Sequence, residues 1–138
     1  TILLVGTETK RRKHVDWELY SSMYDGSVNK KSGILVINLL STNCTSFTTT
    51  HTNEKANVYQ GNYDWFSINS REEYVSLYPF MPDRILDNLI QPEAKISVVN
   101  WDKVYQDWNK LQFLIDATHN DRASCVYDLS RPMKRANS

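Results

Sequence analysis

Two apolar runs separated by a stretch of helical periodicity place the strongest constraint on the fold. The first run, Ile2–Val5, ends at Gly6, and the second spans residues 33–39. Apolar runs without alternation are typical of strands buried on both faces of a parallel sheet. Between them, residues 13–25 carry apolar side chains at every fourth position, which predicts a helix. Its sheet-facing residues would be Val15, Leu19 and Met23. The order strand, helix, strand predicts a βαβ unit.

Residues 41–80 differ in character from the segments on either side. They combine a polar threonine cluster with aromatic residues between Tyr59 and Phe66. We interpret them as a long insertion with little regular structure, apart from a short helix at Arg71 to Leu77. Long connections in compact domains are usually functional or disordered, and the aromatic residues argue against complete disorder.

The last third of the chain returns to the α/β pattern. We predict a short helix over residues 83–90, with Pro82 near its start, and a third strand over residues 96–101. A final helix would follow, capped by Asp102 or Asp107. The side chains lining its apolar side would be Trp108, Leu111 and Ile115. The whole chain, residues 1–138, is therefore predicted to form a single α/β domain with a parallel sheet flanked by helices.

Charge and composition exclude several classes of function. The formal net charge is zero, so we expect no nucleic-acid or anionic-membrane partner. The basic residues Arg131, Lys134 and Arg135 are interpreted as a solvated end. The two cysteines, Cys44 and Cys125, lack the spacing of a zinc site, and we expect no bound metal. No run approaches the ~20 apolar residues of a membrane span, and no signal peptide is visible, which favours a cytoplasmic protein.

The first block of the chain resembles the TIR-like family that includes the Thoeris anti-phage defence proteins. The resemblance rests on the strand TILLVG, a turn rich in Thr, Lys and Arg, and the helix start HVDWEL. The later segments GILVINL, MPDRILDNLI and YDLSRPMKR also look like that family. The resemblance implies a flavodoxin-like fold with strand order 2-1-3-4-5, of which this chain would hold strands three to five.

That strand order has a physical consequence for the first strand. Without two preceding strands, Ile2–Val5 would expose unpaired backbone groups along an apolar edge, and such edges invite pairing with another chain. The chain also opens directly inside this apolar run. We therefore expect either a missing N-terminal segment or self-association through this edge.

The resemblance also implies a chemistry. Catalytic TIR domains cleave the nicotinamide–ribose bond of NAD, as NAD glycohydrolases or ADP-ribosyl cyclases, with NAD as substrate and no cofactor. A carboxylate stabilises the positive charge that develops on the ribose. Glu18 matches that catalytic residue, and Thr7, His14 and Trp17 are expected to bind the NAD or nucleotide derivative. His14 stands where many TIR domains carry tryptophan.

Two alternatives stay open. Glu18 is equally explained as a solvated helix residue favoured by the helix dipole or paired with His14 or Arg11. The domain would then be a non-catalytic module that binds a protein or a nucleotide. Elsewhere, Asp83, Arg84 and Asp87 are spaced as a set of surface ion pairs on one helix.

Overall fold

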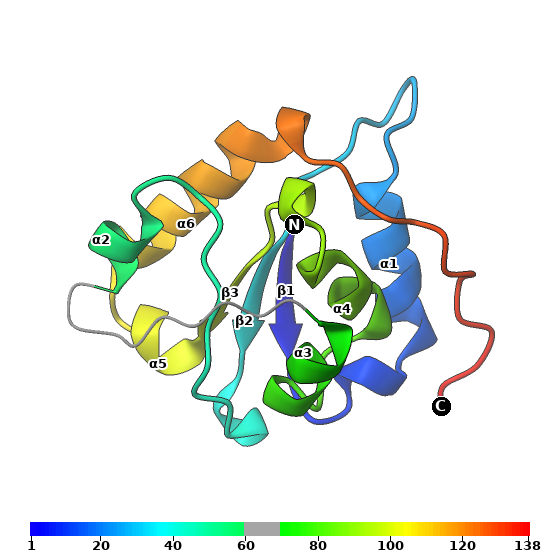
Figure 1. Cartoon of the computed structure of the whole chain (residues 1–138), viewed down its shortest axis with the longest axis horizontal. Coiled ribbons are helices and arrows are strands. Elements are labelled where there is room, and N and C mark those ends of the chain that lie inside the picture. Colours follow the sequence, from blue (N-terminus) through cyan, green and yellow to red (C-terminus); the bar gives the residue numbers. More distant parts are fainter. Residues whose placement is uncertain (60–69) are drawn as a thin grey trace.

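The computed structural model describes residues 1–59 and 70–138. Its centre is a parallel sheet in the order β1-β2-β3, formed by Ile2–Val5, Leu35–Asn38 and Ser97–Asn100. Leu3 is paired with Val36, and Val36 with Val98, which sets the register of the three strands. This is the α/β arrangement expected for a flavodoxin-like fold, with helices on both faces of the sheet (Figure 1). All three predicted strands are confirmed.

One face of the sheet is covered by α1 (Lys13–Met23) and α4 (Asp83–Leu89), with α3 (Arg71–Leu77) packed on α4. Leu19 and Met23 of α1 are almost fully buried there, and Val15 packs against the same core, as the spacing predicts. The predicted helix at Arg71 to Leu77 is also confirmed. Its first turn is capped by the Ser70 hydroxyl, which accepts a hydrogen bond from the Glu73 amide.

The other face is covered by α6 (Trp108–Asp121), α5 (Trp101–Val104) and α2 (Glu54–Val58). Asp107 caps α6 by accepting a hydrogen bond from the Lys110 amide. The predicted buried side of α6 was wrong in part. The core residues are Leu114 and Thr118, whereas Trp108 is 79% exposed and Ile115 37% exposed. Leu111, Leu114 and Thr118 follow the helical repeat equally well, so the spacing of Trp108, Leu111 and Ile115 alone could not select the buried side.

The region from residue 41 to 80 contains more structure than predicted. Leu40–Thr42 forms a single helical turn, and α2 follows at Glu54–Val58. Between them, Thr48 pairs with Val98 of β3 in a single antiparallel bridge. Tyr59 is buried and stacks on Phe47 at 3.8 Å between ring centroids. The predicted aromatic loop otherwise falls on residues 60–69, which lie outside the described residues.

One further expectation about a charged residue was wrong. Arg84 is completely buried, where it binds Asp16 of α1 instead of forming a surface ion pair. The C-terminal segment is exposed over residues 131–138 apart from the half-buried Lys134, as expected for a solvated end, and it runs alongside α1 (Figure 1). The Lys134 amide donates to Asp16 and the Trp17 indole donates to the Lys134 carbonyl.

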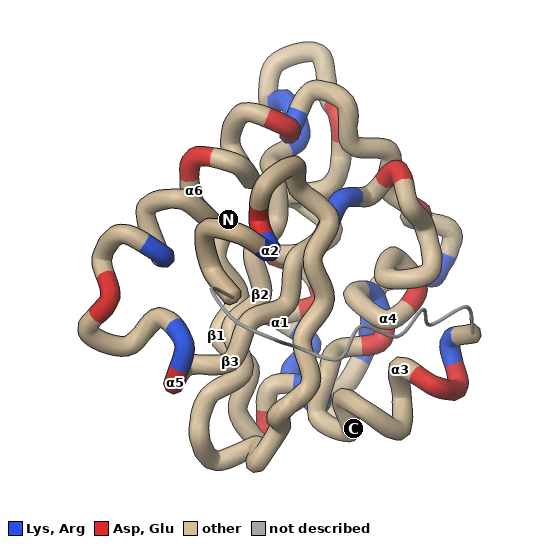
Figure 2. Tube along the Cα trace, turned by 60° about the vertical axis from the view of Figure 1, so that its left-hand side comes forward, with Lys and Arg blue, Asp and Glu red and all other residues tan. Residues whose placement is uncertain are grey.

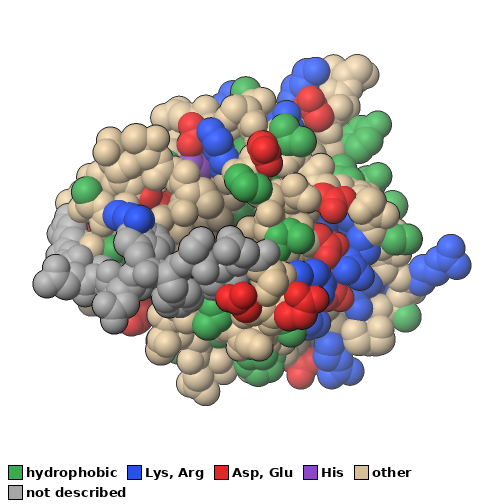
Figure 3. Space-filling model, in the orientation of Figure 1, with side chains coloured by type: hydrophobic (Ala, Val, Ile, Leu, Met, Phe, Trp, Pro, Cys, Tyr) green, Lys and Arg blue, Asp and Glu red, His purple; other side chains and the backbone are tan. Residues whose placement is uncertain are grey.

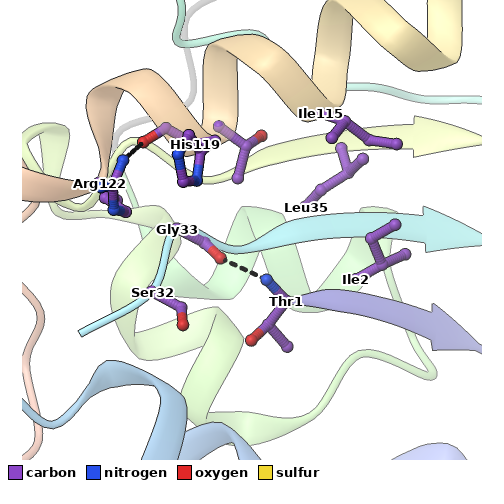
Figure 4. Close-up of a pocket in the computed structure, with 9 residues that line it drawn as sticks. Thr1, Ile2, Ser32, Gly33, Leu35, Ile115, His119 and Arg122 are labelled. Atoms are coloured by element: carbon purple, nitrogen blue, oxygen red, sulfur yellow. Dashed lines mark hydrogen bonds between the residues drawn. The ribbon is translucent and has the colours of Figure 1, made fainter. Parts of the chain in front are cut away.

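The strand β1 forms one edge of the described sheet, as expected for the third strand of a flavodoxin-like order. Its side chains alternate, so that Val5 is buried under α1 and α4 while Ile2 and Leu4 remain 47% and 48% exposed. On the face of Ile2 and Leu4, α6 covers β2 and β3 and stops short of β1. A groove of about 170 Å³ lies between the start of β1 and α6 (Figure 4).

Candidate functional site

The Glu18 carboxylate lies halfway along α1, on the side of the helix that faces away from the core. It lines an open hollow of about 560 Å³ between α1 and Thr1, the residue before β1. The other lining residues are Thr1, His14, Trp17, Ser21 and Ser22. Within the described part of the chain, Glu18 makes no hydrogen bond and no ion pair. The pairing of Glu18 with His14 or Arg11 that we considered as an alternative is therefore absent from this part of the structure.

The structure brings together three of the four residues predicted for this site. His14, Trp17 and Glu18 share one side of α1 because they stand three and four positions apart. The rings of His14 and Trp17 meet edge to face at 5.0 Å, and the Lys13 ammonium lies 5.5 Å from the Trp17 ring centre. Thr7 instead lies exposed in the turn after β1 and does not line the hollow.

This arrangement offers a carboxylate, an imidazole and an indole ring to a bound molecule. Trp17 is held in place because its indole N–H donates to the Lys134 carbonyl oxygen at 2.7 Å. A fixed aromatic face beside a carboxylate can stack a flat ring and stabilise nearby positive charge. The hollow is wide open and is lined by α1 and Thr1, so its own walls do not exclude water from Glu18.

A second hollow lies beyond the carboxyl ends of β2 and β3, where α/β sheets usually bind ligands. It measures about 400 Å³. The lining residues include Asn38, Cys44, Phe47, Asn100, Trp101 and Asp102. At its base the Asn38 amide donates to the Asn100 side-chain oxygen at 3.3 Å, and Asn100 donates to the Ser46 carbonyl at 3.1 Å. The side-chain oxygen of Asn38 is buried without a hydrogen-bond partner among the described residues.

Sequence reasoning missed this pair of asparagines. The available signal was that both apolar runs, ILVIN and ISVVN, end in the same residue type. Parallel strands in register place such terminal residues side by side, which the pairing of Asn38 with Asn100 confirms. None of the residues around Glu18 lines this second hollow.

A third polar cluster is buried at the opposite end of the sheet, where α2 meets β3 and α6. The Ser97 hydroxyl donates to the Glu54 carboxyl group, and His51 Nδ1 lies 2.6 Å from Asp121 Oδ2. Burial raises the pKa of Glu54 to about 7, although hydrogen bonds from Ser97 and the Thr50 backbone oppose the rise. Glu54 is 1% exposed and His51 7% exposed, and neither lines a described hollow. We therefore assign this cluster to the docking of α2.

Metal binding and membrane insertion find no support in the described residues. Over residues 1–59 and 70–138, no three His, Cys, Asp or Glu side chains are grouped as a metal site would require. Cys44 and Cys125 are both free thiols. Among the helices that the structure describes, none has the length and apolar character needed to cross a bilayer.

Comparison with known protein families gives a match at the start of the chain. Residues 1–43 match the family described as Thoeris protein ThsB, TIR-like domain. The matched region contains β1, α1 and β2, and with them Thr7, His14, Trp17 and Glu18. The later segments MPDRILDNLI and YDLSRPMKR lie beyond it. Neither a search of curated proteins nor a search of solved structures found a match.

Proposed function

We propose that this chain is part of a TIR-like, NAD-consuming signalling protein of the Thoeris type, acting in the cytoplasm in bacterial anti-phage defence. The observation that carries the proposal is that Glu18 falls inside the region matched to the ThsB TIR-like domain. The fold supports the same reading, since the match spans a complete βαβ unit of a parallel α/β sheet.

The surroundings of Glu18 suit the chemistry of nicotinamide release. Cleavage of the nicotinamide–ribose bond passes through an oxocarbenium-like state, which a nearby carboxylate stabilises. In our proposal Glu18 supplies that charge and Trp17 offers its indole face to a flat ring. His14 lies against Trp17 at 5.0 Å, where it would limit the space beside the ring. The product would be ADP-ribose or a cyclised derivative of it.

The test measures nicotinamide release from NAD by the wild-type protein and by Glu18→Gln. This substitution removes the charge but keeps the shape of the side chain, so we expect a loss of at least about a hundredfold in rate. The matched control is Glu72→Gln, because Glu72 is also an exposed glutamate on a helix and lies away from the hollow. Equal rates for wild type and Glu18→Gln would overturn the catalytic assignment.

A specific observation also favours a second function, that of a non-catalytic interaction module. Ile2 and Leu4 leave an apolar strip exposed beside the free edge of β1. A strand from another polypeptide segment could pair there and cover both side chains. We propose that a second copy of the chain is one such partner, and that the module would bind without turnover.

Light scattering separates this second function from the first. If β1 edges pair, the wild-type mass should exceed that of one chain, and Leu4→Lys should return it to one chain. Val28→Lys provides the control, because Val28 is an 88% exposed apolar residue in a loop away from β1. A mass that is unchanged by Leu4→Lys would reject pairing through this edge, whatever the outcome of the nicotinamide assay.

A further inference from the structure

A basic pocket of about 190 Å³ lies where the start of α1, the start of α4 and the C-terminal segment meet. Its lining residues are Lys10, Arg12, Asp16, Pro82, Asp83, Arg131, Pro132 and Lys134. Charged residues of both signs gather in this part of the molecule, around α3 and α4 (Figures 2 and 3). The pocket shares no lining residue with the hollow of Glu18.

The ion pairs around the pocket leave an excess of positive charge. The bases of this network are Lys10, Arg12, Arg71, Arg84, Arg131 and Lys134, and the acids are Asp16, Asp83 and Asp87. Six bases against three acids give these nine residues a formal charge of +3, in a chain whose total formal charge is zero. The residues that line the pocket, four bases and two acids, alone carry a formal charge of +2.

The two acids that line the pocket, Asp16 and Asp83, are already paired with basic residues. Asp16 accepts two hydrogen bonds from Arg84, at 2.7 and 3.1 Å, and a third from the Lys134 amide at 2.8 Å. Burial favours the neutral acid, but these hydrogen bonds outweigh it and lower the pKa of Asp16, which keeps it ionised and paired. Asp83 accepts from Arg71 at 3.0 Å and faces Lys10 at 3.6 Å. Neither acid is left to neutralise the remaining bases.

Two of the lining bases have no acidic partner within the described residues. The Arg12 guanidinium makes no ion pair or hydrogen bond there, and the Lys134 ammonium donates to a main-chain oxygen of Ser138, at 2.8 Å. Behind the pocket, Arg84 is completely buried and its Nη1 has no hydrogen-bond partner among the described residues. Cationic side chains that line a pocket without an Asp or Glu partner are suited to bind phosphate.

The backbone adds to this positive potential. The pocket lies at the N-terminus of α1, an eleven-residue helix whose dipole is positive at this end. One of the first amides is already used, since the Lys13 N–H donates to Asn137 Oδ1 at 2.8 Å. The side chains of Arg12 and Lys134 would therefore make the main contacts, and the helix would supply a favourable field.

From these observations we infer that the pocket binds the phosphate group of a small, soluble phosphorylated compound, with Arg12 and Lys134 as its principal ligands. The concave shape and the limited volume suit a phosphate or diphosphate group. A long polyanion such as nucleic acid would not fit into a pocket of about 190 Å³, whereas a phosphate or diphosphate group would. This site is independent of the proposed NAD chemistry at Glu18.

Isothermal titration calorimetry with pyrophosphate and with inorganic phosphate, in a chloride buffer, tests the inference. We expect saturable binding that is tighter for pyrophosphate and that weakens as salt is raised. Arg12→Gln and Lys134→Gln should each raise the Kd by roughly tenfold, as expected for the loss of one charge-assisted contact. Lys30→Gln and Arg122→Gln are the matched controls, since both bases are exposed and lie outside the pocket.

A second measurement keeps the test decisive if a substitution disturbs folding. In the wild-type protein, pyrophosphate should shift the amide NMR signals of Lys13, Asp83 and Lys134 more than those of residues on α6. The absence of saturable binding would overturn the inference, as would equal losses in the control variants. Tighter binding of a short oligonucleotide than of pyrophosphate would overturn the assignment to a small ligand.

Discussion

The guanidinium of Arg84 and the carboxylate of Asp16 bind each other through two hydrogen bonds inside the core. They join α4 to α1, and Tyr20 covers the guanidinium carbon at 5.1 Å from its ring centre. Arg84 also donates to the Pro132 carbonyl at 3.4 Å, so the same group anchors the C-terminal segment. Two helices and the end of the chain therefore depend on one buried ion pair.

Removing one partner of this pair should destabilise the protein strongly. Arg84→Met leaves the Asp16 carboxylate buried without its cation, and we expect a loss of about 3–5 kcal/mol in the free energy of unfolding. Replacing both partners, as in Asp16→Leu with Arg84→Met, should recover part of that loss because no charge then remains buried. Urea unfolding measures both values. A loss below about 1 kcal/mol for Arg84→Met would contradict this account.

The buried Glu54 makes stability depend on pH in a defined direction. Its pKa is about 7 in the folded protein, above its ordinary value of 4.5, so the folded state binds the proton more tightly. The stabilising contribution is complete below about pH 4.5 and is lost as the pH rises through 7. We expect Glu54→Gln to remove this dependence and to be more stable than wild type at pH 8.5 by about 2–3 kcal/mol.

Urea midpoints between pH 5 and pH 8.5 measure this effect. Glu93→Gln is the control, because Glu93 is an exposed glutamate and should leave the pH profile of the wild type unchanged. A Glu54→Gln variant that still loses stability between pH 6 and 8, in parallel with wild type, would show that another group is responsible.

Gly33 is required because α6 approaches the chain closely just before β2. A Cβ atom at this position would lie 2.3 Å from the Thr118 carbonyl oxygen and 2.7 Å from its methyl carbon. Since the oxygen belongs to the helix backbone, it cannot move aside easily. Gly33→Ala should lower the free energy of unfolding by about 1–3 kcal/mol, which a shift of the thermal midpoint would measure.

Gly6 provides the matched comparison for that prediction. A Cβ atom at Gly6 would meet its nearest neighbours at 3.8 Å, which is ordinary contact, and Gly6 does not adopt a positive φ. Gly6→Ala should therefore be neutral or slightly stabilising. If the two alanine variants melted at the same temperature, the close approach of α6 to Gly33 would not be the reason for this glycine.

The parts of the fold that could be predicted are those set by local pattern. The runs that became β1, β2 and β3 are apolar over several consecutive residues, and the spacing of Leu19 and Met23 identified the buried side of α1. α2 was missed because its five residues are too short to show a period. The surface assignment of Arg84 failed for a related reason, since its partner Asp16 is 68 residues away in the chain.

The candidate sites likewise include residues that the sequence could bring together and residues that it could not. His14, Trp17 and Glu18 are neighbours by helical geometry alone, so sequence spacing could bring them together. The basic pocket could not be found from sequence, because Arg12 and Lys134 come from opposite ends of the chain. The role of Glu18 itself stays a prediction that the nicotinamide assay will decide.

The amide pair of Asn38 and Asn100 has a consequence for how the sheet is assembled. β2 and β3 are short, apolar and joined by a long connection, so several misaligned pairings would bury similar apolar area. In a pairing shifted by one residue, Asn38 would face Val99 or Trp101, Asn100 would face Ile37 or Leu39, and both would lose the amide partner. The two amides thus disfavour a shift by one residue in either direction, and the polar pair selects the native register from apolar pairings of similar area.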